Sequence, residues 1–136
     1  NNVSERLTLY NELATLKTEK ELIAFQNKLI DRFGALPKQA INLLDSVRIK
    51  WIASKAGIEK LVLKQGKMVG YFVSDQQSMY YQSAQFRKVL QFIQVYPRLA
   101  SLKEKQTKNG LRLLLTFDQI KSITKALENL QKLQKL

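Results

Sequence analysis

Hydrophobic residues recur every three to four positions through the first part of the chain, which is the spacing of an amphipathic helix. Ser4 precedes the first such run and belongs to the residue types that cap helix N-termini, so we expect a helix to begin there. Thr18 and Glu21 match the capping-box pattern and predict a second helix from about Glu19 to Phe33.

Two glycines and a proline mark the ends of the next segments. Gly34 stands where a left-handed residue ends a helix, and Pro37 stands where a new helix can begin. The helical spacing then continues to Ala56, and Gly57 supplies a second stop signal. Three helices are therefore expected within residues 1–57.

After Gly57 the period changes from that of a helix to that of a strand. Residues 58–73 read as two strands around the turn Gln65-Gly66-Lys67, which predicts a β-hairpin. A polar loop over residues 74–78 follows. Helical spacing then returns from Ser83 to Tyr96, where Pro97 stops the helix.

The last part of the chain repeats the hairpin-then-helix order. Leu99 to Leu102 are expected to form a strand that leads into a turn at Asn109-Gly110, and alternating apolar residues follow on the far side. Asp118 is then expected to cap a final helix with an apolar stripe that includes Ile120. The predicted order is ααα-ββ-α-ββ-α, an α+β fold in which both hairpins form one small antiparallel sheet packed against helices.

Length and composition are those of one ordinary folded domain. The chain has 136 residues, 45% hydrophobic and 25% charged, so we expect a single domain with a helical part (1–57) and a hairpin-helix part (58–136). No run approaches the roughly 20 apolar residues of a membrane span. The N-terminus lacks a signal-peptide pattern and cysteine is absent, so a soluble, intracellular protein without membrane contact is expected.

The missing residue types argue against independent catalysis. The chain has no His and no Cys, which removes the commonest general base, the commonest thiol nucleophile and the usual zinc ligands. Its 11 acidic residues are scattered, and no Gly-rich phosphate-binding motif is present. We therefore predict no catalytic residues, no metal site and no cofactor in this chain.

The formal charge of +12 is placed unevenly. Residues 1–45 hold six basic and six acidic side chains, whereas residues 46–136 hold 17 basic and five acidic ones. A field of this kind attracts polyanions such as nucleic acid. The best local case for phosphate contact is a cluster at the second hairpin: Lys103, Lys105, Lys108 and Arg112. A solvated edge that resists aggregation is the alternative reading of the same cluster.

A set of aromatic residues lies near Lys67 in the sequence: Tyr71, Phe72, Tyr80 and Tyr81. With a basic rim these side chains could stack on the bases of a single strand. The other reading is that they fill one face of the sheet.

Asp31 conflicts with the helix that contains it. It lies in the last turn of the second helix, where the macrodipole disfavours negative charge by roughly 0.3 to 1 kcal/mol. Three accounts remain open: an ion pair with Lys28, a hydrogen bond to backbone beyond Gly34, or a surface contact with an arginine of another domain.

One string of residues carries a family resemblance. It reads Leu29-Ile30-Asp31-Arg32-Phe33-Gly34-Ala35-Leu36-Pro37, preceded by Arg6-Leu-x-Leu-Tyr10 and followed by Gly57-Ile58-Glu59-Lys60-Leu61. These motifs resemble the C-terminal regulatory domain of the transcription-repair coupling factor (Mfd) family over at least residues 3–63. The later half matches in the order of its elements and in its hydrophobic pattern.

The resemblance implies a C-terminal fragment of a long bacterial, cytoplasmic DNA translocase that uses ATP and Mg²⁺ in motor domains outside this chain. In that family the domain packs on the N-terminal UvrB-like module and masks the surface that recruits UvrA until RNA polymerase is engaged. The implied docking residues are Lys28, Asp31 and Arg32, with Lys28 standing where other members carry an acid. A nucleic-acid-binding module that uses the basic half of the chain is the rival expectation.

Overall fold

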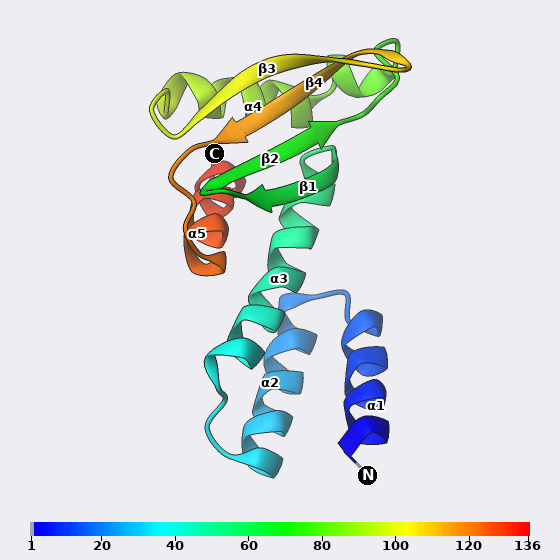
Figure 1. Cartoon of the computed structure of the whole chain (residues 1–136), viewed down its shortest axis with the longest axis vertical. Helices are drawn as coiled ribbons and strands as arrows, with labels where there is room; N and C mark the ends of the chain where they lie inside the picture. The colour runs from blue at the N-terminus through cyan, green and yellow to red at the C-terminus, as the bar shows by residue number, and fades with distance from the viewer. Residues whose placement is uncertain (1) are drawn as a thin grey trace. The chain divides into compact units, whose positions relative to one another are not determined.

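The computed structural model describes residues 2–136, which fall into two compact units (Figure 1). One unit extends to Leu44 and the other comprises Asp45–Leu136. The boundary between the two units lies inside α3 (Lys38–Lys55). The sequence instead suggested a division after α3, at residue 57. The expectation that residues 1–136 form a single domain stays a prediction.

The first unit is built on two neighbouring helices, α1 (Asn2–Thr15) and α2 (Glu19–Phe33), shown in blue in Figure 1. Because α1 begins at Asn2, Ser4 lies inside the helix, and the prediction that it caps the N-terminus is wrong. The Ser4 carbonyl instead accepts a hydrogen bond from the Thr8 hydroxyl, 3.0 Å away. The buried apolar side chains of this unit are Leu13, Leu22, Phe25 and Leu44.

Both ends of α2 follow the sequence signals. The Thr18 hydroxyl accepts the Glu21 N–H at 3.1 Å, and the Glu21 carboxylate accepts the Thr18 N–H at 3.1 Å, which completes the capping box. At the other end Gly34 adopts φ +81°, and its N–H donates to the Ile30 carbonyl at 2.8 Å. The predicted bounds of α2 are confirmed.

The second unit contains one four-stranded antiparallel sheet with the order β1-β2-β4-β3. Its strands are β1 (Ile58–Lys64), β2 (Lys67–Phe72), β3 (Ala100–Thr107) and β4 (Gly110–Phe117). Both predicted hairpins are confirmed, and β2 pairs with β4 to join them. β3 extends to Thr107, beyond the predicted end at Leu102, so Lys103 and Lys105 lie in the strand and not in the turn.

The helix after the first hairpin also agrees with the sequence signals. α4 (Ala84–Val95) has Ser83 as its N-cap and Tyr96 as its C-cap. A short 3₁₀ helix, η1 (Met79–Gln82), precedes it. Its four residues are too few to show a helical period, so the sequence does not predict it.

The start of the last helix corrects a prediction. α5 spans Ile123–Gln134, and its N-cap is Ser122, whose hydroxyl accepts the Lys125 N–H at 3.0 Å. Asp118 therefore does not cap it. Ile120 lies before the helix, buried, and donates its N–H to the Gly66 carbonyl at 2.8 Å. Ile120 thus extends the core beyond β4 before the helix begins.

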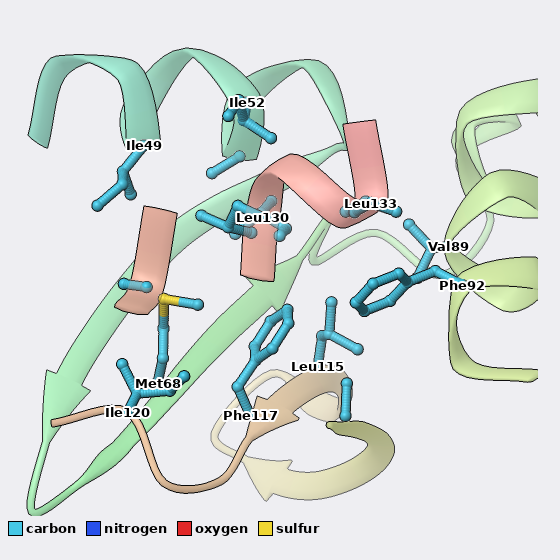
Figure 2. Close-up of a cluster of buried hydrophobic side chains, with 14 of the residues drawn as sticks. Ile49, Ile52, Met68, Val89, Phe92, Leu115, Phe117, Ile120, Leu130 and Leu133 are labelled. Atoms are coloured by element: carbon cyan, nitrogen blue, oxygen red, sulfur yellow. The ribbon is translucent and has the colours of Figure 1, made fainter. Parts of the chain in front are cut away.

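Helices cover one face of the sheet. Alternate strand residues, including Met68 and Phe117, point toward the part of α3 that belongs to this unit and toward α4 and α5 (Figure 2). The helices contribute Ile49, Ile52, Val89, Phe92, Leu130 and Leu133 to this core. The predicted α+β fold, with a small antiparallel sheet packed against helices, is confirmed.

Gly57 offers a test of this packing. It adopts φ +86°, and a Cβ at this position would lie 2.1 Å from the Tyr80 ring. Gly57→Ala should therefore destabilise the protein by roughly 2 to 4 kcal/mol, because it adds a ring clash to backbone strain. The midpoint of urea unfolding measures the effect.

Gly66→Ala is the matched control. Gly66 also has a positive φ, +76°, but nothing lies within 4 Å of the added Cβ. It should cost only about 1 to 2 kcal/mol, the backbone part alone. Equal losses in the two variants would contradict the predicted role of the Tyr80 contact.

Candidate functional site

Asp31 lies exposed in the last turn of α2. Among residues 2–136 no ion pair or hydrogen bond engages its carboxylate. A negative charge therefore stays at the helix end that disfavours it, without compensation from the described chain.

The two cations beside Asp31 are engaged elsewhere. Lys28 Nζ lies 2.9 Å from the Glu12 carboxylate, and Arg32 Nη2 lies 3.1 Å from the Glu5 carboxylate. Both pairs bridge α2 to α1. Each cation remains more than half exposed, so each pair links the two helices but contributes at most about 1 kcal/mol.

The structure bears on the two local accounts of Asp31. An ion pair with Lys28 is not formed, because the ammonium group of Lys28 turns to Glu12. A hydrogen bond from a backbone N–H beyond Gly34 to the Asp31 carboxylate is also absent from the described residues. A contact with an arginine of another domain stays a prediction.

An apolar hollow lies in the same unit. Its volume is about 340 Å³, and α1, α2 and the beginning of α3 contribute to its walls. Phe33 lines it and is 51% exposed, with the Arg32 guanidinium 5.1 Å from its ring centroid. The end of α2 thus presents an unpaired carboxylate and an exposed aromatic ring within three residues.

The basic cluster at the second hairpin divides into different roles. Arg112 is largely built into the fold: its guanidinium donates to the Phe72 carbonyl at 3.1 and 3.2 Å and pairs with Glu59 at 2.8 Å. Lys108 is exposed in the hairpin turn. Lys103 and Lys105 are exposed on β3, and Lys105 lies directly opposite Arg112.

Most of the aromatic set does not form a stacking platform. Phe72, Tyr80 and Tyr81 pack with one another and with Phe86 at ring-centroid separations of 5.1 to 6.1 Å and join the hydrophobic core. The Tyr80 hydroxyl donates to the Ala56 carbonyl and the Tyr81 hydroxyl to the Val73 carbonyl. Burial raises the pKa of both phenols, so both stay neutral at physiological pH. The reading in which these residues fill the sheet face is the correct one.

Tyr71 is the exception, because it lies on the opposite face of β2 from Phe72. Three cations approach its ring: Lys60 at 5.4 Å, Lys105 at 5.7 Å and Arg112 at 5.3 Å from the centroid. Alternation along β2 is enough to predict that Tyr71 and Phe72 point to opposite faces of the sheet. The approach of Lys60, Lys105 and Arg112 to Tyr71 cannot be predicted in this way, because it depends on the order of the strands.

Two general classes of site are absent from the part of the chain that the structure describes. No three acidic side chains within residues 2–136 come together as metal ligands. No helix among the same residues has the length and apolar character needed to cross a bilayer.

Comparison with known families agrees with the motifs around Asp31. The family profile of the TRCF domain matches residues 1–83, more than half of the chain. This chain belongs to the TRCF domain family. The matched region contains α1, α2 and α3, and therefore Lys28, Asp31 and Arg32 of the candidate site.

The curated relatives that match this TRCF domain are much longer proteins. The transcription-repair-coupling factor of Escherichia coli is 48% identical over 60 residues, which are 44% of this chain and 5% of that protein. The factor of Rickettsia conorii is 35% identical over 99 residues, which are 72% of this chain and 8% of that protein. The TRCF domain described here thus spans less than a tenth of the relatives it matches.

A solved structure shares the fold of both units. The crystal structure of the C-terminal domain of a transcription-repair coupling factor matches with a TM-score of 0.71 at 20% identity, covering 97% of this chain and 80% of that one. At this identity the likeness establishes the fold.

Removal of the Arg112 side chain should destabilise the fold. Arg112→Met removes the guanidinium that donates to the Phe72 carbonyl and pairs with the Glu59 carboxylate, so we expect a loss of about 1 to 3 kcal/mol in unfolding free energy. Lys108→Met removes the same charge from the exposed turn and should change stability by less than about 0.5 kcal/mol. Urea unfolding of both variants provides the comparison, and an unaffected Arg112→Met variant would contradict the assignment.

The capping box predicts a pH effect. Hydrogen bonds from the Lys17 N–H, and then from the Thr18 hydroxyl, hold the pKa of the Glu21 carboxyl below its usual value. The stability that this carboxylate contributes is therefore present above the ordinary glutamate pKa of about 4.3 and is lost as pH falls through the lowered folded-state pKa.

Glu21→Gln should therefore lose less stability than the wild type as the solution is acidified through this range. Glu104→Gln removes an exposed carboxylate from β3 and serves as the charge-matched control. Urea unfolding across the acid range measures the slopes. A slope for Glu21→Gln as steep as that of Glu104→Gln would contradict the prediction.

Proposed function

We propose that this TRCF domain is a non-catalytic docking element that packs on an N-terminal, UvrB-like module of its parent protein and masks the surface that binds UvrA. The observation that carries the proposal is the exposed, unpaired Asp31 at the C-terminal end of α2. Its local alternatives are absent, and a cationic partner on another module would supply the missing compensation.

The neighbouring ion pairs define what each residue contributes. Lys28 and Arg32 pair with α1 and keep the end of α2 in a fixed position, so they act as positioning residues for the carboxylate. Asp31 itself would make the contact, as an acceptor for an arginine fork. By the resemblance, Lys28 also places a positive charge where other family members can carry an acid, so the contact in this protein would depend more heavily on Asp31.

The exposed Phe33 and the apolar hollow of the same unit supply a second component. A charged contact alone fixes orientation and gives little net affinity, whereas an aromatic side chain enclosed on docking contributes buried apolar area. Asp31 and Phe33 lie within three residues of each other on α2. A partner surface with an arginine beside an apolar patch would match both.

A modest contact energy suffices for regulation. A docked state favoured by a few kcal/mol keeps the open state below about 1%, and engagement of RNA polymerase would need to supply a comparable free energy to release it. ATP, Mg²⁺ and DNA would bind to motor domains of the parent outside this chain, in the bacterial cytoplasm. The docked domain would act as a lock, meaning that it keeps the UvrA-binding surface of the parent protein masked.

Charge reversal tests the lock. In the full-length parent protein, Asp31→Arg should raise UvrA binding, because the mask opens more often. The isolated chain carrying the same change should bind the separately produced N-terminal module roughly tenfold more weakly than the wild type, which corresponds to about 1.4 kcal/mol. Isothermal titration calorimetry measures the second effect directly.

A charge-matched control separates the docking contact from general electrostatics. Glu104→Arg makes the same charge change at an exposed position on β3 and should leave both measurements unchanged. An arginine of the N-terminal module whose change to Asp restores binding of Asp31→Arg would identify the partner residue. Unchanged UvrA binding and unchanged module affinity in Asp31→Arg would overturn the proposal.

A further inference from the structure

The face of the sheet opposite the helices carries a concentration of cations. Alternation along each strand places Tyr71 on this outer face, and the register aligns Lys60, Tyr71, Leu114 and Lys103 in one row across all four strands. Residues two positions away on the same strands share the face. Its basic members are Lys60, Lys64, Lys67, Lys103, Lys105 and Arg112.

Most of this charge is not neutralised by the protein. Arg112 pairs with Glu59, and Lys67 lies 3.8 Å from Asp118, so both are partly compensated. Within residues 2–136, the other four lysines of the outer face make no ion pair. All four are exposed: Lys60, Lys64, Lys103 and Lys105.

The lysines surround an apolar and hydroxyl-bearing centre. The row next to Tyr71 consists of Val62, Val69, Thr116 and Ser101 in register across the sheet. Neighbouring strands lie about 4.8 Å apart, so the backbones of the two edge strands, β1 and β3, are about 14 Å apart. The side chains of Lys60 and Lys105 extend from these edges toward the Tyr71 ring, so positive charge reaches from both edge strands toward the middle of the face.

We propose that this outer face binds the sugar-phosphate backbone of nucleic acid without reading its sequence. An acidic peptide is a poorer match, because peptides dock through a free strand edge or into a groove, and this surface is the broad side of the sheet. A phosphate backbone needs only spaced cations and donors. The Tyr71 ring is already approached by three cations, so it holds lysines in place and is not free to stack on a base.

The site differs from the hairpin cluster that the sequence suggested. Lys103 and Lys105 belong to it, but they act with Lys60 and Lys64 of β1, which the order β1-β2-β4-β3 and the register place on the same face at the opposite edge of the sheet. Arg112 serves the site by its contacts with Phe72 and Tyr71, and Lys108 in the turn is outside the face. None of the residues of the proposed lock takes part, so either proposal can fail without the other.

Salt dependence of binding tests the proposal on the 136-residue chain. With about four phosphate contacts, the affinity for a labelled duplex of random sequence should fall roughly 150-fold between about 50 and 200 mM salt, a log–log slope of about −3.6. Fluorescence anisotropy with a duplex and with a single strand, each in two unrelated sequences, measures the slope. The two sequences should bind equally.

Two triple variants of equal net charge locate the site. Lys60→Gln/Lys103→Gln/Lys105→Gln should bring the slope to about −1, because each phosphate-contacting lysine contributes about one unit. Lys20→Gln/Lys121→Gln/Lys135→Gln changes exposed lysines outside the face and should keep the wild-type slope. Circular dichroism confirms that both variants retain the fold.

Three results would overturn the proposal. Absence of binding at the lowest salt excludes a nucleic-acid surface. Equal losses in the two triple variants assign the effect to net charge and not to this face. Polyglutamate that displaces the duplex at equal charge concentration assigns the face to an acidic protein partner instead.

Discussion

The antiparallel pairing of β2 with β4 is the interaction on which both faces of the sheet depend. Met68 lies opposite Phe117 and Tyr71 opposite Leu114, so a single register assigns every residue of the two central strands to the helix-covered face or to the outer face. A slip of one residue would exchange the two sets and expose Phe72 and Leu115, both fully buried now. The hydrophobic core therefore enforces the register, and the cation-bearing face follows from it. The positions of Lys60 and Lys103 in one row are a consequence of packing on the other side of the sheet.

At the end of α2 a different constraint operates. Helix-dipole energetics favour cations in the last turn, and Arg32 meets that preference while Asp31 opposes it. The two cations beside Asp31 are compensated within the fold, because Lys28 and Arg32 form ion pairs with acidic side chains of α1. No described residue does the same for Asp31. A residue that costs stability in its own helix and gains nothing within its own fold is the kind of exception that a binding role explains.

The sequence predicts those parts of the fold that rest on local physics. The capping box of Thr18 and Glu21, the stop at Gly34 and the two hairpins all follow from short-range rules, and the structure confirms them. Asp118 was the wrong cap because Ile120 joins the core before α5 begins, and this tertiary contact overrides the local signal. Strand order could not be predicted for a related reason, since nothing local to β2 or β4 indicates that these two strands pair. The convergence of Lys60, Lys105 and Arg112 on Tyr71 was consequently out of reach, whereas the anomaly of Asp31 was readable because it violates a rule within one helix.

The uneven charge distribution links the two surfaces. Where six basic and six acidic side chains balance in residues 1–45, a single unpaired carboxylate is conspicuous and can specify a contact. Where 17 basic side chains meet five acidic ones in residues 46–136, no single lysine is decisive, and the collective field matters. Glu59 and Asp118 relieve repulsion only at Arg112 and Lys67. The four remaining lysines of the outer face repel one another in the free chain, and an anion from outside would remove that repulsion on binding. The first surface is thus suited to one defined partner, and the second to any partner that carries regularly spaced negative charge.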